Sequence, residues 1–164
     1  MGRPLSPKKN TPDCDLVYTP KELACSIIQH FNPEGVILDP CRGTGAFYDS
    51  YPLTSVKYYC EIEENIDFFD FDKKVDWIIT NPPWSKFKEF LSHGMKIADN
   101  IVYLVTINHF MTKARIRMIR ENGYGFKEIL MVETPKTDWP QSGFQLAAIH
   151  IQKDWSGPVT ITYK

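Results

Sequence analysis

Short apolar runs alternate along the chain with longer segments in which an apolar residue recurs every three or four positions. The runs at 36–38, 75–80 and 101–107 have the length of strands, and their nearly unbroken apolar character is typical of strands buried on both faces of a parallel sheet. Helical spacing occurs at 20–31, 85–99 and 109–121. Strands that alternate with helices predict an open, three-layer α/β domain with a mostly parallel sheet.

The ends of these elements carry their own signals. Thr19 is a suitable N-cap, Pro20 suits the first helical position, and Glu22 completes a capping box. The remaining predicted elements are a short helix at 46–51, strands at 56–62, 66–71, 126–133 and 144–152, and a last strand within 156–164. Because no helix separates 126–133 from 144–152, these two strands should pair antiparallel at one edge of the sheet.

Composition supports a globular domain and excludes several other classes of protein. The chain has 164 residues, of which 43% are apolar and 24% charged, whereas a disordered chain is poor in apolar residues and strongly charged. The longest apolar run, 101–107, is far shorter than the roughly 20 residues of a membrane helix, and the polar N-terminus is unlike a signal peptide. We therefore expect a soluble, cytoplasmic protein with an irregular lead-in at 1–17 and one domain at 18–164.

Net charge and cysteine content say little about function, and only one predicted helix carries a notable cluster of charge. The formal net charge of −1 gives no indication of a nucleic-acid partner. However, one predicted helix carries Lys113, Arg115, Arg117 and Arg120, which could contact phosphates or simply form a solvated face. The four cysteines form no CxxC pair and no histidines cluster, so we expect no metal site and no redox motif.

The first chemistry-bearing segment, 39–47, follows the strand at 36–38, at the sheet edge where ligands bind in such folds. Asp39 places a carboxylate at the strand end, and Gly43 and Gly45 allow the backbone to approach a ligand closely. The segment is neither a phosphate loop nor GxGxxG, and its acid suits a cationic or hydroxyl-bearing ligand. A tight turn that merely closes a strand–helix unit is the alternative.

An acidic residue follows the next strand. Glu61 lies about 20 residues further on, where an acid in nucleotide-binding folds accepts hydrogen bonds from ribose hydroxyls. Taken alone, Glu61 could equally be an ordinary surface carboxylate. The interpretation as a ribose ligand therefore depends on the glycine-rich segment that precedes it.

A second chemistry-bearing segment, Asn81-Pro82-Pro83-Trp84, ends the strand at 75–80. Two prolines stiffen the chain and remove two backbone donors, which frees the carbonyls of Asn81 and Pro82 to accept from a ligand. With the Asn81 amide and the flat face of Trp84, the segment suits a planar molecule with an exocyclic amino group, such as a base. A rigid loop with a core tryptophan is the alternative.

In order and spacing, YTPKELA, DPCRGTGAF, CEIEEN and NPPW resemble segments of S-adenosylmethionine-dependent amino-methyltransferases, especially adenine-N6 DNA methyltransferases. The NPPW tetrapeptide after a buried strand is the specific part, because glycine-rich loops are common to many cofactor folds. The resemblance implies a three-layer, Rossmann-like methyltransferase fold, with S-adenosylmethionine as the cofactor. The Cys41-Arg42 pair departs from the family's usual Ala-Cys or Cys-Ala, so Arg42 is unusual; a surface arginine is the alternative.

The resemblance also implies roles for the matching positions. The cofactor-binding positions would be Thr19, Pro20, Asp39, Pro40, Gly43, Gly45, Phe47, Glu61 and Asp67. Of these, Thr19 and Pro20 would contact the methionine end, and Glu61 would hold the ribose. Asp67 would meet the amino group of the cofactor's adenine, with Asp70 as the alternative. The catalytic segment would be Asn81, Pro82, Pro83 and Trp84.

The implied reaction is a direct in-line transfer of the methyl group to an exocyclic amino nitrogen. Since the resemblance is to adenine-N6 DNA methyltransferases in particular, the expected acceptor is N6 of adenine in DNA. Asn81 and Pro82 would accept hydrogen bonds from the amino group, and Trp84 would stack on a base flipped out of the duplex. Alternatives are an RNA base, a protein glutamine amide, or a non-catalytic cofactor-binding subunit. Because no separate target-recognition domain is expected, specificity would come from loops such as 134–143 or from a specificity subunit.

Overall fold

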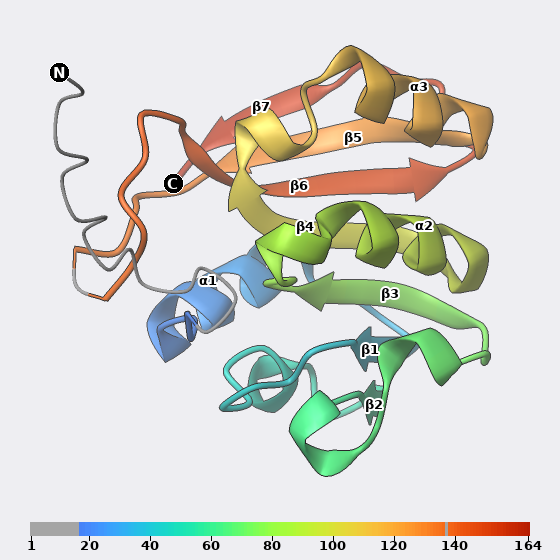
Figure 1. Ribbon diagram of the computed structural model, residues 1–164, viewed down its shortest axis with the longest axis vertical. Coiled ribbons are helices and arrows are strands. Elements are labelled where there is room, and N and C mark those ends of the chain that lie inside the picture. Colours follow the sequence, from blue (N-terminus) through green and yellow to red (C-terminus); the bar gives the residue numbers. More distant parts are fainter. Residues whose placement is uncertain (1–16, 137) are drawn as a thin grey trace, which may run out of the picture.

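The computed structural model describes residues 17–136 and 138–164, and within them seven strands form one sheet in the order β2-β1-β3-β4-β6-β5-β7 (Figure 1). Their bounds are β1 (Val36–Asp39), β2 (Val56–Tyr59), β3 (Val75–Thr80), β4 (Ala98–Thr106), β5 (Tyr124–Met131), β6 (Leu146–Lys153) and β7 (Thr160–Tyr163). Strand β6 runs antiparallel to both of its neighbours, whereas the other pairs are parallel. The mostly parallel sheet is confirmed. The antiparallel strand lies inside it rather than at an edge, because β5 and β7 continue the sheet beyond β6. Most of the expected lead-in, residues 1–16, lies outside the described residues.

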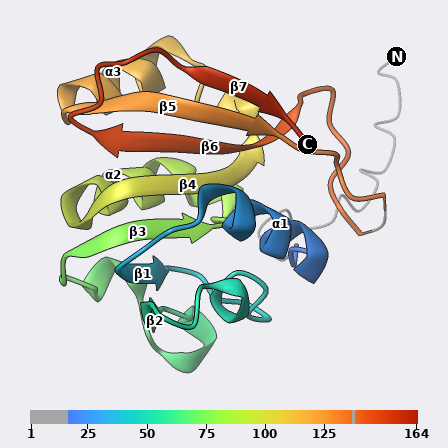
Figure 2. The same ribbon diagram turned by 180° about the vertical axis from the view of Figure 1, so that it is seen from behind.

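Helices cover both faces of the sheet, as three layers require. The helices are α1 (Lys21–Phe31), α2 (Phe87–Ile97) and α3 (Lys113–Glu121), with short 3₁₀ helices η2 (Tyr48–Ser50), η3 (Ile62–Glu64), η4 (Phe68–Asp70), η5 (Trp84–Lys86) and η6 (Ile107–His109). Figure 1 shows α2 and α3 on the near face, and Figure 2 shows α1 on the opposite face. Helix α2 forms the crossover between β3 and its parallel neighbour β4.

The core is divided by the sheet into two clusters, and β4 contributes to both. Ile101 and Tyr103 belong to the cluster beneath α2 and α3, whereas Val102 and Leu104 belong to the cluster beneath α1. Alternate side chains of a strand point to opposite faces, so a strand covered on both sides must be apolar throughout. This explains the unbroken apolar run that predicted the parallel sheet.

Two local predictions are wrong, and a third is confirmed only in part. Helix α1 begins at Lys21 with Pro20 as its N-cap and no side-chain capping bond, because Thr19 is buried one residue upstream rather than capping. The segment at 66–71 is not a strand: Asp67 accepts a hydrogen bond from the Phe69 N–H (2.9 Å) and caps η4, whose Phe68 is buried. The segment at 46–51 contains only the single-turn η2.

The other elements differ from prediction only at their ends. Strand β3 coincides with the predicted 75–80, whereas β4 begins three residues before the expected start. Helix α3 begins at Lys113 because the Thr112 hydroxyl accepts from the Arg115 N–H (3.2 Å) and fixes the first turn there. Among the described helices, none has the length and apolar character needed to cross a membrane.

A buried histidine on the α1 side of the sheet makes stability depend on pH. His150 is 3% exposed, lies against Trp77 (5.0 Å between ring centroids) and is hydrogen-bonded through Nε2 to Asn100 Oδ1 (3.0 Å). Burial lowers the pKa of His150 from 6.5 to about 4. The unfolded chain therefore binds this proton more readily than the folded chain between those two pH values.

We predict that the stabilisation of the wild-type protein relative to His150→Gln falls by about 3 kcal/mol between pH 7 and pH 4. The neutral imidazole contributes fully above pH 6.5, and this contribution is lost as the pH falls toward 4. Urea denaturation across this range measures the difference, with the interval between pH 7 and 8, where the difference should be constant, as an internal control. A difference independent of pH throughout would contradict the prediction.

Candidate active site

The carboxyl ends of β1, β2 and β3 surround a cavity of about 270 Å³, and a second cavity of about 40 Å³ adjoins it. The larger cavity is lined by residues 17–18, 41–44, 61–64 and 81–83. The smaller one shares part of this wall and adds Thr19, Ala46, Phe47 and Thr80. The two chemistry-bearing segments and Glu61 are thus brought together at the sheet edge where α/β folds bind ligands.

Not every predicted site residue reaches these cavities. Those that line one or both are Thr19, Gly43, Phe47, Glu61, Asn81, Pro82 and Pro83. Those that line neither are Pro20, Asp39, Pro40, Gly45, Asp67 and Trp84. Asp67 is occupied in capping η4, so its contact with a cofactor adenine stays a prediction, as does that of the exposed Asp70. Within the described residues, no three His, Cys, Asp or Glu side chains gather as metal ligands.

Asp39 lies buried behind the glycine-rich segment. Its Oδ1 accepts from the Thr80 hydroxyl (2.7 Å) and from the Cys41 N–H (3.3 Å), whereas Oδ2 is buried without a hydrogen-bond partner among the described residues. Burial raises the pKa of Asp39 from 3.8 to about 7, and the nearby charge of Glu61 adds to this effect. The site therefore keeps a carboxyl group at a position where its charged form is disfavoured.

Two side chains that were not predicted as site residues hold the strand ends in place. The Cys41 thiol donates to the Asn81 carbonyl (3.2 Å), and burial raises its pKa, which keeps the thiol neutral. The buried Tyr51 hydroxyl donates to the Ile79 carbonyl (2.6 Å). Cys41 lies within the glycine-rich motif and Tyr51 within none, but neither role was expected, because each acts through a long-range contact that only the fold creates. The two contacts fix the backbone at the start of the Asn81 segment and two residues before it.

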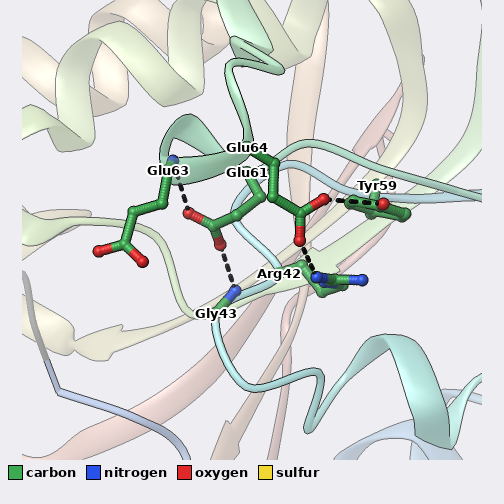
Figure 3. Close-up of polar contacts among 6 residues, drawn as sticks. All are labelled: Arg42, Gly43, Tyr59, Glu61, Glu63 and Glu64. Atoms are coloured by element: carbon green, nitrogen blue, oxygen red, sulfur yellow. Dashed lines mark hydrogen bonds and ion pairs between the residues drawn. The ribbon is translucent and has the colours of Figure 1, made fainter.

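The Glu61 carboxylate is held from two sides by backbone donors. The Gly43 N–H donates to Oε2 (2.7 Å), and the Glu63 N–H donates to Oε1 (3.3 Å), as Figure 3 shows. Glu61 is thus the N-cap of η3 as well as part of the cavity wall. A carboxylate oxygen has further lone pairs, so Glu61 can accept from a ligand hydroxyl while both backbone bonds persist.

Asn81 presents an unpartnered acceptor beside the cavity. Its Nδ2 donates to the Val17 carbonyl (3.4 Å), which orients the amide. Its Oδ1 is buried and has no hydrogen-bond partner among the described residues. Leaving a buried acceptor unpaired costs roughly 1–3 kcal/mol, so such an atom calls for a partner that the protein itself does not provide.

Trp84 is packed against other rings rather than lying on the cavity wall. Its Nε1 donates to the Leu104 carbonyl (3.3 Å), and its ring contacts His109 (5.2 Å between centroids) and Trp139 (6.3 Å). Trp139 belongs to the loop at 134–143, which was expected to contribute specificity, and is buried. Burial also lowers the pKa of His109, which favours its neutral form as a packing ring.

The basic helix presents part of its charge outward. The exposed cations of α3 are Lys113, Arg117 and Arg120, which line one shallow hollow with Ile116 and Glu121. Arg115 instead turns inward, where its guanidinium lies 5.2 Å from the Phe87 ring centroid and its Nε donates to the His109 carbonyl (3.3 Å). The predicted set of four exposed cations is therefore reduced to three.

The chain as a whole resembles known proteins in its fold and not in its sequence. No protein-family model matches the sequence, and no curated protein matches it. A proposed RNA methyltransferase from Pyrococcus horikoshii superposes with a TM-score of 0.66 at 17% identity, over 89% of this chain and 90% of that chain. The methyltransferase subunit of a type I restriction-modification system from Streptococcus thermophilus gives a TM-score of 0.67 at 14% identity, over 93% of this chain and 48% of that one.

A third similar structure was solved with a ligand. M. jannaschii TYW2, in complex with AdoMet (S-adenosylmethionine), gives a TM-score of 0.51 at 15% identity, over 83% of this chain and 78% of that chain. The chain spans about half the length of the restriction-modification subunit and nearly all of the Pyrococcus protein. At these identities the similarity establishes the fold, which is the Rossmann-like fold of methyltransferases.

Proposed function

We propose that this protein transfers a methyl group from S-adenosylmethionine to an exocyclic amino nitrogen of a nucleic-acid base, N6 of adenine in DNA. The observation that carries the proposal is the buried, unpartnered Asn81 Oδ1, at the start of a double-proline segment on the cavity wall. Two further points support the proposed function. The segment Asn81-Pro82-Pro83-Trp84 resembles the NPPW motif of amino-methyltransferases, and the similar structures have a methyltransferase fold.

The residues of the larger cavity fit S-adenosylmethionine. When bound, this cofactor supplies a methyl group activated by attachment to a sulfonium. Glu61, fixed by Gly43 and Glu63, can accept from ribose hydroxyls, and the carboxylates around the cavity favour a cationic ligand. Behind the glycine-rich segment, Asp39 Oδ2 has no partner among the described residues and can accept a further hydrogen bond.

Asn81 and Pro82 would orient the accepting amine. An exocyclic amino group is a poor nucleophile because its lone pair is delocalised into the ring. Hydrogen bonds from that group to Asn81 Oδ1 and to the Pro82 carbonyl favour a pyramidal nitrogen whose lone pair is available. The amide of Asn81 is neutral near pH 7 and cannot take the proton, so its contribution is orientation and electrostatics, and the proton leaves to solvent.

The outward cations of α3 support a nucleic-acid substrate over a protein amide. The ion pairs found within the described residues are His30–Glu128 and Arg42–Glu64, so Lys113, Arg117 and Arg120 form none there, although Glu121 lines the same hollow. Cations on one helix face, at i, i+4 and i+7, suit successive phosphates of a backbone. The similar restriction-modification subunit works within a larger system, and we propose that a specificity subunit likewise assists this chain.

We predict that Asn81→Ala lowers the methylation rate of adenine-containing DNA at least about 10²-fold while the Kd for S-adenosylmethionine stays within about twofold. The substitution removes the acceptor for the amine but leaves Glu61 and its backbone donors intact. Nucleoside mass spectrometry of DNA and RNA measures the product, and calorimetry measures cofactor binding. Asn122→Ala, at the end of α3, is the matched control.

The same assays separate the alternatives. Methylated RNA or protein glutamine without methylated DNA would contradict adenine in DNA as the target. Cofactor binding without any methylated product would contradict catalysis and favour a supporting subunit of a larger enzyme.

We predict that combining Lys113→Ala, Arg117→Ala and Arg120→Ala weakens DNA binding and reduces the slope of log K against log salt by about 2–3, since each lost phosphate contact removes about 0.9. Arg115→Ala should change the slope little, because this side chain packs inward on Phe87. Fluorescence anisotropy with labelled duplex DNA at several salt concentrations measures both. Equal slopes for the triple variant and the wild type would exclude this face from phosphate contact.

We predict that Asp39→Asn is more stable than the wild type at pH 8 by roughly 2–4 kcal/mol, yet binds S-adenosylmethionine several-fold more weakly. The raised pKa of Asp39 means that the folded state holds its proton up to about pH 7, so wild-type stability falls as the pH rises from about 4 through 7. Asparagine keeps the Oδ1 acceptor for Thr80 and carries no charge. Urea denaturation at pH 4 and 8, with calorimetry, tests this; a wild type that is the more stable form at pH 8 would refute it.

A further inference from the structure

The glycine-rich segment and the segment after β2 are joined by successive contacts (Figure 3). The Arg42 N–H donates to the Cys60 carbonyl (3.0 Å), and the Gly43 N–H donates to Glu61 Oε2 (2.7 Å). The Arg42 guanidinium forms an ion pair with Glu64. Residues 42–43 are therefore held against residues 60–64 by two backbone donors and one side-chain ion pair.

The Arg42 side chain is itself fixed in position. Its guanidinium lies 4.1 Å from the centroid of the Tyr59 ring. The Tyr59 hydroxyl donates to Glu64 Oε2 (2.9 Å), while Arg42 contacts Oε1 of the same carboxylate. The three side chains thus close a triangle in which each contacts the other two. An arginine suits this place because its planar guanidinium can lie over a ring and pair with a carboxylate at the same time.

This triangle stands beside the group that we assign to the ribose. Arg42, Glu61 and Glu64 all line the larger cavity. The orientation of Glu61 depends on the Gly43 N–H, and the position of Gly43 depends on its neighbour Arg42. Glu61, Glu63 and Glu64 also crowd three acidic side chains into four residues, and their mutual repulsion is offset by the single cation of Arg42.

We propose that Arg42, together with Tyr59 and Glu64, is a positioning residue of the S-adenosylmethionine site. It holds the glycine-rich segment against residues 61–64, so that the Glu61 carboxylate is already oriented for the ribose hydroxyls before the cofactor binds. The inference rests on the proposed function. It gives a purpose to the arginine that departs from the family pattern, which sequence alone could equally assign to the surface. Preorganisation of this kind raises affinity by reducing the entropy lost on binding.

Calorimetry with S-adenosylmethionine tests the proposal on the full chain. Arg42→Ala should raise the Kd about tenfold, equivalent to about 1.4 kcal/mol. Arg42→Lys should recover part of this loss, because the ammonium pairs with Glu64 but cannot stack as a plane on Tyr59. Tyr59→Phe, which keeps the ring and removes the hydroxyl, should raise the Kd about threefold. Lys127→Ala, which removes a cation 4.9 Å from the Trp155 ring centroid on distant β5, is the matched control and should leave the Kd unchanged.

Steady-state kinetics distinguish positioning from a general structural defect. Arg42→Ala should raise the KM for S-adenosylmethionine and leave kcat at saturating cofactor unchanged, because the Asn81 segment is untouched. A fall in kcat together with the melting temperature would mean a structural role and would overturn the proposal. If Arg42→Ala does not fold, Arg42→Lys and Tyr59→Phe decide, and an unchanged Kd in both would likewise overturn it. A wild type that fails to bind S-adenosylmethionine refutes the proposed function itself, whereas unchanged affinity in the Arg42 variants refutes this inference alone.

Discussion

A single buried residue, Asp39, joins the ends of the three strands on which the site is built. Its side chain accepts from the Thr80 hydroxyl at the end of β3 (2.7 Å), and its carbonyl accepts from the Cys60 N–H just after β2 (2.8 Å). The three segments that line the larger cavity after the strands all leave the sheet next to these bonds. A residue placed for packing alone would be apolar here, since burial of a carboxyl disfavours its charged form.

At this edge of the sheet, groups that we propose for function destabilise the folded state. Asp39 Oδ2 and Asn81 Oδ1 are buried acceptors without protein partners, and each such group destabilises the folded state by roughly 1–3 kcal/mol. Elsewhere, the buried His150 is hydrogen-bonded to Asn100, whereas Ser55 Oγ, Asn108 Oδ1 and Trp139 Nε1 are also buried without partners among the described residues. Of the five such atoms in the described residues, Asn81 Oδ1 belongs to the cavity wall and Asp39 Oδ2 lies behind it, where a ligand could satisfy them.

The sequence predicted the parts of the structure that depend on local pattern and missed those that depend on distant contacts. Two-sided burial makes a strand apolar throughout, so β3 and β4 were recognisable, and the stiff double-proline segment located Asn81 at a strand end. The segment around Asp67 has apolar residues as a buried strand would, but the structure buries its Phe68 from a 3₁₀ turn instead. The sequence pattern alone does not distinguish these two cases. Nothing local shows that Arg115 packs on Phe87 or that Arg42 reaches Glu64 across 22 residues. Such contacts exist only once the fold has brought the partners together.

The same geometry bears on how much of a target these residues can distinguish. In the proposed reaction, Asn81 and Pro82 recognise an amino group, which selects the kind of base but not its neighbours. The cations of α3 extend over about 10 Å from Lys113 to Arg120, and contacts to phosphate carry no sequence information directly. Trp139, in the loop at 134–143, is buried against Trp84 and is therefore occupied in packing. The groups assigned here therefore provide affinity and base type, and recognition of a particular sequence requires contacts from other surfaces, which is the physical reason for proposing a specificity partner.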